Sequence, residues 1–151
     1  MQREVKLLVV LGGGHRVGLP IRYVRETMRP RPLMPFRDAP PHVLGMSVIR
    51  GASVPVVALG ALIGEATVSN NFLRFVTLEV EGRAVALAVE SVVDVISIRA
   101  EELSSLSPLL ARAAGGVVEA LSVLDAELLL VLQAARVLEA SGPFALEGPT
   151  P

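Results

Sequence analysis

One pattern of residues occurs twice in this chain, and the repeat limits the folds that are open to it. The first repeat matches residues 19–26 (LPIRYVRE) with residues 87–94 (LAVESVVD), 68 positions further on. A second repeat matches residues 55–59 (PVVAL) with residues 130–134 (LVLQA), 75 positions further on. An internal repeat of apolar, strand-like segments predicts two similar structural units. A duplicated β unit without an obvious catalytic motif favours a protein that presents surfaces to partners.

The length and the apolar composition indicate a single aliphatic core. A chain of 151 residues forms one domain, or two half-sized lobes that share a core, because a lobe of about 70 residues is only marginally stable alone. The sequence is 52% hydrophobic but only 3% aromatic, so valine, leucine, isoleucine and alanine must fill that core. The scarcity of aromatic residues argues against an aromatic ligand pocket and against a surface that stacks nucleic-acid bases.

Charge and cysteine content exclude further classes. The net charge is −1, and the one dense basic stretch, residues 22–37, is interpreted as a solvated connector because prolines interrupt it. The chain has no cysteine, which excludes disulfides and thiolate chemistry and fits a reducing cytoplasm. The first residues do not resemble a signal peptide, and no apolar run reaches the roughly 20 residues that span a bilayer. We therefore expect a soluble, cytoplasmic protein.

Short apolar segments separated by glycine turns predict an all-β fold with a few short helices. We expect residues 19–27 to begin as a strand and to continue as a helical turn that carries Val24. The proline-rich residues 28–41 should form no regular element. The predicted strands are residues 5–11, 43–49, 54–59, 72–80, 84–89, 91–98, 117–124 and 128–132. The predicted helical segments are a turn at 60–64, a helical or irregular stretch at 101–114 and a closing helix at 134–140.

No arrangement of residues predicts a catalytic, cofactor or metal site. The glycines at residues 12–14 precede Pro20 and a strand pattern, whereas a nucleotide-binding loop needs a helix at that point. Ser47 lacks the second glycine of a nucleophile elbow. The only histidines, His15 and His42, are interpreted as solvated loop residues. We therefore predict that the chain is not an enzyme and holds neither a cofactor nor a metal ion.

Five motifs in a fixed order make the chain resemble a known family. They are residues 18–26 (GLPIRYVRE), 39–45 (APPHVLG), 49–51 (IRG), 54–57 (VPVV) and 89–95 (VESVVDV). In this order and spacing they resemble the CheW family of bacterial chemotaxis coupling proteins. The resemblance extends over about residues 5–140 and so covers nearly the whole chain.

The resemblance implies a mainly β fold made of two SH3-like five-stranded barrel lobes that share a hydrophobic core. Residues 1–140 would form this single CheW-like domain. The first lobe would span roughly residues 16–80, and the second roughly residues 81–140 together with the N-terminal strand. Residues 141–151 are rich in proline and glycine and are expected to form a disordered tail.

The resemblance also implies a function without catalysis. CheW-like proteins bridge the cytoplasmic tips of methyl-accepting chemoreceptors to the regulatory domain of the CheA histidine kinase, and adaptor and kinase domain alternate in rings by joining the ends of their barrels. The expected partners are therefore a receptor tip and a CheA-type kinase, with no nucleic acid and no direct membrane insertion. The expected location is the cytoplasm, at a receptor array.

By motif position, five residues are expected to border or shape a receptor-binding groove between the lobes: Val24, Glu26, Gly45, Arg50 and Gly51. Arg50 is the strongest candidate, as a charged anchor at the edge of an apolar patch. Each also has a purely structural interpretation. Arg50 could be a solvated turn residue, Glu26 a surface carboxylate and Val24 a core residue, while the glycines could serve only backbone geometry.

Four residues depart from the pattern usual in the family. Val48 stands where asparagine is usual, Ala58 where aspartate follows the Pro-Val-Val motif, Val17 where an aromatic is common, and Glu90 where aspartate is usual. The departures leave two hypotheses open, neutral drift in an ordinary adaptor or an accessory protein that binds only receptor or only kinase. A small enzyme or ligand-binding barrel is a third alternative, which the absence of a converging catalytic or metal set disfavours.

Overall fold

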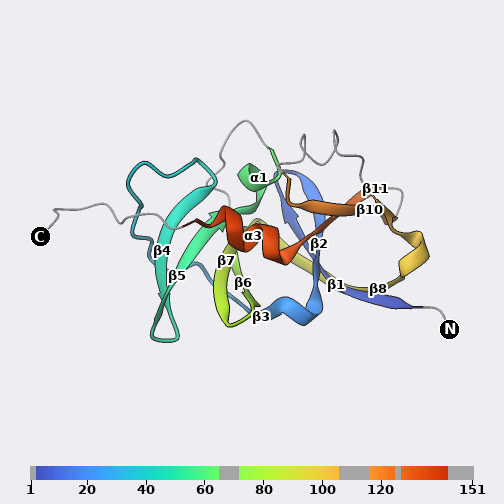
Figure 1. Cartoon of the computed structure of the whole chain (residues 1–151), viewed down its shortest axis with the longest axis horizontal. Helices are drawn as coiled ribbons and strands as arrows, with labels where there is room; N and C mark the ends of the chain where they lie inside the picture. The colour runs from blue at the N-terminus through green and yellow to red at the C-terminus, as the bar shows by residue number, and fades with distance from the viewer. Residues whose placement is uncertain (1–2, 65–71, 106–115, 125–126, 143–151) are drawn as a thin grey trace, which may run out of the picture.

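The computed structural model describes residues 3–64, 72–105, 116–124 and 127–142. Most of these residues belong to two β-sheets. The sheets lie side by side, and helix α3 crosses the middle of the molecule (Figure 1). The five-stranded sheet has the order β3-β6-β7-β5-β4, and the six-stranded sheet has the order β8-β1-β2-β11-β10-β9.

The strands of the five-stranded sheet are β3 (Val24–Met28), β4 (Val43–Ile49), β5 (Ala52–Ala58), β6 (Arg74–Val80) and β7 (Arg83–Val89). Those of the six-stranded sheet are β1 (Glu4–Gly12), β2 (His15–Pro20), β8 (Ser91–Arg99), β9 (Ser104–Ser105), β10 (Val118–Leu124) and β11 (Glu127–Leu132). The helical elements are the 3₁₀ turns η1 (Ile21–Tyr23) and η2 (Ala100–Glu102) and the α-helices α1 (Leu59–Leu62) and α3 (Ala134–Ala140).

Each strand of the five-stranded sheet has an equivalent in the six-stranded sheet, in which β9 is an additional strand. In the β1–β2 hairpin Leu8 pairs with Leu19, and at the corresponding place in the β6–β7 hairpin Val76 pairs with Leu87. Both hairpins turn through two residues with positive φ, the second of which is a glycine. The next strands repeat as well, because β3 pairs with β6 as β8 pairs with β1, and both ladders contain a bulge at the equivalent position. The first repeat in the sequence is therefore a repeat of strand pairing.

The second repeat relates the β4–β5 hairpin to the β10–β11 hairpin, and the two have the same register and the same bulge. Val56 on β5 pairs in parallel with Ala86 on β7, and Val131 on β11 pairs in parallel with Gly18 on β2. The second repeat makes Val56 equivalent to Val131, whereas the first repeat makes Gly18 equivalent to Ala86. The parallel ladder between β5 and β7 in one lobe is therefore equivalent, by both repeats, to the parallel ladder between β11 and β2 in the other lobe. The lobes are structural duplicates.

The lobes are not consecutive in sequence, because strands are exchanged between the halves of the chain. β1 and β2 pair with β8 and β11, so the second lobe consists of β1, β2 and β8 to β11, and the first lobe consists of β3 to β7. The expected boundaries, 16–80 and 81–140, misplace β2 and β7. β2 pairs with β1 in the six-stranded sheet, and β7 pairs with β6 in the five-stranded sheet. Val24 also differs from the expectation, since it begins β3 while the helical turn ends before it.

One aliphatic core lies between the sheets, as predicted. A single cluster of buried side chains includes Val10 and Leu19 from the six-stranded sheet and Leu78 and Leu87 from the five-stranded sheet. Two smaller clusters, one in each lobe, lie apart from this shared core. Helix α3 follows β11 in the second lobe but packs against β6 and β7 of the first lobe. Shared burial and this crossing helix join the lobes into one body.

Most predicted elements are confirmed, including the closing helix at 134–140, and the turn expected at 60–64 is α1, which begins one residue earlier. Ser141, placed by the prediction in a disordered tail, is buried, and its Oγ donates a hydrogen bond to the carbonyl of Leu138 at 2.6 Å. The remaining tail, the turn at 125–126 and most of the stretch at 101–114 lie outside the described residues. In the described part of the chain, no helix has the length and apolarity needed to cross a membrane.

Candidate functional site

Glu26 and Arg50 form an ion pair that joins the two edges of the first lobe's sheet. Glu26 lies on β3 and Arg50 directly follows β4, the outermost strands of that sheet. Arg50 Nε donates to Glu26 Oε2 at 2.6 Å, and Arg50 Nη2 donates to Glu26 Oε1 at 3.0 Å. The edges of a flat five-stranded sheet would lie about 19 Å apart, beyond the reach of these side chains. The sheet must therefore curl into a barrel, and the pair spans the closure.

The backbone at Arg50 directs its side chain toward this closure. Arg50 and Gly51 are the two central residues of the β4–β5 turn, with φ of 51° and 77°. Two positive φ values define the hairpin turn whose twist matches the flanking strands, and an arginine is uncommon at the first of these positions. The Arg50 side chain is 77% exposed. Two of its five N–H groups bind Glu26, which leaves three for other acceptors.

Electrostatics stabilise the charged state of both partners. The hydrogen bond from Arg50, together with its positive charge, lowers the pKa of Glu26 below its ordinary value of 4.5. The same hydrogen bond and charge from Glu26 raise the pKa of Arg50. Arg25 and Arg31 add smaller favourable fields at Glu26. At neutral pH the site therefore presents a guanidinium that is held in place by a charged carboxylate.

Gly45 supports the site from inside the lobe and does not contribute surface. It is buried on β4 and has a φ of 141°, which side chains rarely permit. A Cβ at this position would lie 2.3 Å from the carbonyl oxygen of Met34. Met34 and Met46 exchange two backbone hydrogen bonds, both 2.8 Å long, across this contact. Gly45 thus lets the proline-rich connection between β3 and β4 pair closely with β4.

Val24 occupies a position that is duplicated at the junction of the lobes. It begins β3 opposite Leu78, and its equivalent in the first repeat, Val92, lies on β8 opposite Val10. Both valines are half-buried and pack against the core that the lobes share. They are therefore apolar side chains on the outermost strand of each sheet, partly accessible where the two lobes meet.

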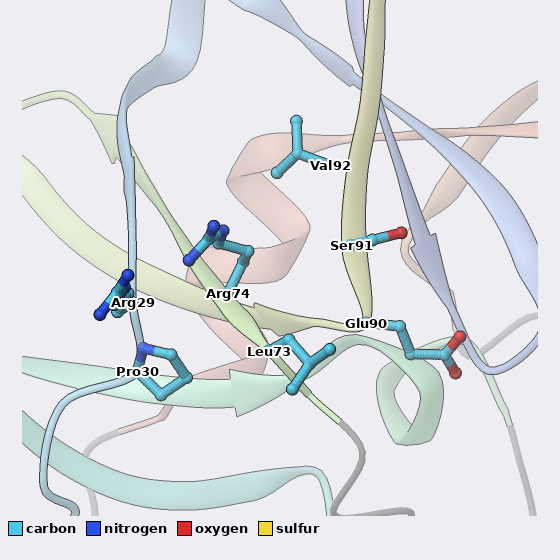
Figure 2. A pocket seen from close by; sticks show the side chains of 7 residues that line it. All are labelled: Arg29, Pro30, Leu73, Arg74, Glu90, Ser91 and Val92. Atoms are coloured by element: carbon cyan, nitrogen blue, oxygen red, sulfur yellow. The ribbon is translucent and has the colours of Figure 1, made fainter.

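A hollow of about 670 Å³ opens at this junction, between the end of β3, the start of β6 and the start of β8 (Figure 2). None of the five predicted site residues lines it, and the sequence analysis missed those that do. The first repeat is the signal that could have found it, because it aligns Val24 with Val92. The hollow is lined by Arg29, Pro30, Leu73, Arg74, Glu90, Ser91 and Val92.

The structure assigns structural roles to the other residues that the sequence made candidates. Ser47 is fully buried and its Oγ donates to the carbonyl of Pro32 at 2.8 Å. His42, interpreted as a solvated loop residue, is half-buried, and its Nε2 lies 2.9 Å from the carbonyl oxygen of Ala140. His15, expected in a loop, begins β2. Among the described residues, no group of three or more acidic, histidine or cysteine side chains is placed to hold a metal ion.

The four departures from the family pattern fall into two structural classes. Val17 is fully buried in the shared core, and Ala58 is the buried residue that precedes α1. Val48 is 53% exposed on β4, an edge strand, and Glu90 lines the hollow at the lobe junction. Only the second class can meet a partner directly.

This duplicated β fold, joined through one core, is what the comparisons with known proteins match. Residues 6–142 match the family model described as a CheW-like domain. The chain belongs to the CheW family. The resemblance seen in the sequence is thereby confirmed, and with it the mainly β, CheW-like fold. Members of this family are scaffold and adaptor proteins of chemotaxis, which agrees with the prediction from the sequence.

A solved CheW structure has the same fold. The scaffolding protein TtCheW from Thermoanaerobacter tengcongensis superposes with a TM-score of 0.74 and is 22% identical. The match covers 87% of this chain and 90% of that chain. At this identity the similarity concerns the fold. No curated protein matches the sequence.

Proposed function

We propose that this CheW-like chain is a non-catalytic adaptor that couples the cytoplasmic tip of a chemoreceptor to a CheA-type histidine kinase. The observation that carries the proposal is the duplication of the whole lobe, down to strand register and bulges. A protein with two equivalent lobes has two equivalent outer ends and one unique junction between them. Such a molecule is suited to join neighbours in an array and to receive a third partner at its centre.

The receptor is assigned to the junction and to the adjoining closure of the first lobe. Val24 and Val92 offer apolar area there, and the N–H groups of Arg50 that do not bind Glu26 offer donors. An amphipathic receptor helix would bury its apolar face against the valines and place an acceptor near Arg50. Glu26 would hold the guanidinium in place, and Gly45 and Gly51 would set the backbone that carries it.

The kinase regulatory domain is assigned to the outer ends of the lobes. Val48 on β4 and Val123 on β10 are equivalent under the second repeat, and both are exposed, at 53% and 70%. β4 is an edge strand, and β9 pairs only with Ala120 and Leu121 on the outer side of β10. Exposed apolar side chains on accessible strand edges favour docking of another β domain. A receptor that moves the junction would change the kinase's conformational equilibrium through these ends.

The alternative is an accessory adaptor that binds only one partner, and Val48 is the observation that favours it. Val48 replaces the family's usual asparagine at an exposed position, so a polar contact there would be lost. Ala58 carries no such weight, because it is the N-cap of α1, where aspartate would bond the helix and not a partner. We expect Val48→Asn to strengthen kinase binding in the accessory case and Ala58→Asp to leave it unchanged.

The test is co-purification of the chain with two separate probes from its own organism. One is the cytoplasmic hairpin of a chemoreceptor, and the other is the regulatory domain of a CheA-type kinase. Retention of both probes supports the coupling adaptor. Retention of one probe alone supports the accessory adaptor, and retention of neither at concentrations above about 100 µM contradicts both.

A further inference from the structure

Two arginines face each other across neighbouring strands at the mouth of the junction hollow. Met28, the last residue of β3, pairs with Phe75 on β6. Arg29 follows the end of this ladder and Arg74 precedes Phe75, and Figure 2 shows the two arginine side chains next to each other. Both residues are exposed and both line the hollow. Within the described residues, neither guanidinium forms an ion pair. Like charges that face each other across neighbouring strands are destabilising. The two arginines therefore do not contribute to the stability of the fold.

The second lobe provides an internal comparison, because the first repeat places the same position there. Lys6 is the equivalent of Arg74, and it pairs with Ser97, the equivalent of Arg29. The equivalent hollow, of about 480 Å³, is lined by the cations Arg3, Lys6 and Arg22 and by the carboxylates Glu4 and Glu119. At the equivalent strand pair the duplicate thus has one cation opposite a neutral side chain, and the charges that line its hollow are of both signs. The facing arginines belong to the first lobe alone and do not follow from the fold.

Among the described residues that line the first hollow, Glu90 is the one carboxylate, and it does not neutralise the arginines. Figure 2 shows the guanidinium groups of Arg29 and Arg74 on one side of the hollow, whereas the carboxylate of Glu90 points away on the other side. Between them lies Leu73, an apolar side chain that is 69% exposed. The hollow therefore combines an unbalanced positive rim with an exposed apolar wall.

We propose that Arg29 and Arg74 together bind a carboxylate of the partner segment that docks at the lobe junction. The segment's neighbouring apolar side chain enters the hollow beside Leu73. This inference rests on the proposed function and names the chemistry of its receptor segment, a helix with an aspartate or glutamate three or four residues from an apolar anchor, so that both lie on one face. Guanidinium groups suit this task because they bind carboxylates in a fixed, planar geometry.

The test compares arginine variants for binding to a chemoreceptor cytoplasmic hairpin by isothermal titration calorimetry. The double variant Arg29→Gln/Arg74→Gln should bind about five- to tenfold more weakly, because two partly exposed charge contacts are lost. Arg83→Gln is the matched control, since Arg83 is an exposed arginine at the opposite end of the same β6–β7 hairpin. It should bind as the unchanged chain does. The difference should shrink when the salt concentration rises from about 0.05 M to 0.5 M.

Two further arms separate the possible outcomes. Arg29→Lys/Arg74→Lys keeps both charges but not the planar geometry, so it should lose less affinity than the double glutamine variant. Unchanged circular dichroism and melting temperature of the double glutamine variant exclude misfolding as the cause of its loss. Replacing the acidic residues on the binding face of the hairpin with their amides should weaken binding to the unchanged chain but not to the glutamine variant. A hairpin that the unchanged chain does not bind contradicts the proposed function. Equal binding by the unchanged chain and the double glutamine variant overturns this inference alone.

Discussion

Arg50 donates two hydrogen bonds to Glu26, a residue 24 positions earlier on the opposite edge of the same sheet. The pair can act in two ways. It can stabilise the closed barrel of the first lobe, or it can orient the guanidinium of Arg50 for contact with a partner. Its exposure favours the second use, because ion pairs at the surface add little to stability. The two uses predict different outcomes when the charges are exchanged.

We expect Arg50→Glu to weaken receptor binding at least tenfold while the melting temperature changes by less than about 3 °C. Exchanging the pair, as Glu26→Arg/Arg50→Glu, restores the ion pair but removes the positive charge from the turn. This double variant should remain defective in binding, as judged by calorimetry with the receptor hairpin. Recovery of binding on exchange would instead show that Arg50 acts only through barrel closure.

Gly45 and Gly51 should respond differently to the same substitution. Gly45→Ala should lower the free energy of unfolding by about 2–4 kcal/mol, because its Cβ would collide with the carbonyl of Met34 and its φ is unfavourable. Gly51→Ala should cost only about 1 kcal/mol, since its φ is also positive but no atom lies within 4 Å of the added Cβ. Urea unfolding followed by circular dichroism measures both. An equal decrease in the free energy of unfolding for both variants would mean that the close approach of Gly45 to Met34 does not affect stability.

The Glu26–Arg50 pair should stabilise the protein in a pH-dependent way. Because Arg50 lowers the pKa of Glu26 in the folded state, this contribution is complete above the ordinary value of 4.5 and disappears as the pH falls through the lowered pKa. The stability difference between the unchanged chain and Glu26→Gln should therefore be largest near neutral pH and vanish in acid. Urea midpoints at a series of pH values test this, and a difference that grows toward acid would contradict it.

The shared core should make both lobes unfold together. Leu19 and Leu87 are equivalent, fully buried and part of one cluster although they lie in different sheets. Leu19→Ala and Leu87→Ala should each cost about 2–5 kcal/mol, and each should shift one single transition. Unfolding monitored by circular dichroism and by hydrogen exchange in each lobe should give the same midpoint. Two separated transitions would show that the lobes are independent domains.

The sequence predicted the repeated strands because their apolar periods and glycine turns are local signals. It did not predict which sheet each strand joins, since the period of β2 or β7 fixes a buried face but not a neighbour. The exchange of β1 and β2 into the second lobe depends on pairing with β8 and β11, which lie in the other half of the chain. The same limit applies to the core, whose aliphatic character was foreseen while its division into one shared and two smaller clusters was not.

The candidate site was foreseen in part for a similar reason. Motif positions selected both Glu26 and Arg50, but only the curled sheet shows that they bind each other. Gly45 was selected as a residue that borders or shapes the groove, and its close approach to Met34 fits the alternative that it serves backbone geometry. Arg29 was assigned to a solvated connector, because its partner position on β6 is distant along the chain. Arg29 and Arg74 come together through the register of β3 on β6, and the composition of the sequence does not reveal that register.

Assembly of a ternary complex tests the central claim most directly. The chain, a chemoreceptor cytoplasmic hairpin and the regulatory domain of a CheA-type kinase would be mixed and separated by size-exclusion chromatography with light scattering. An adaptor predicts one peak that contains all three proteins, with receptor and kinase domain failing to elute together when the chain is omitted. Elution of the chain apart from both partners would contradict the account.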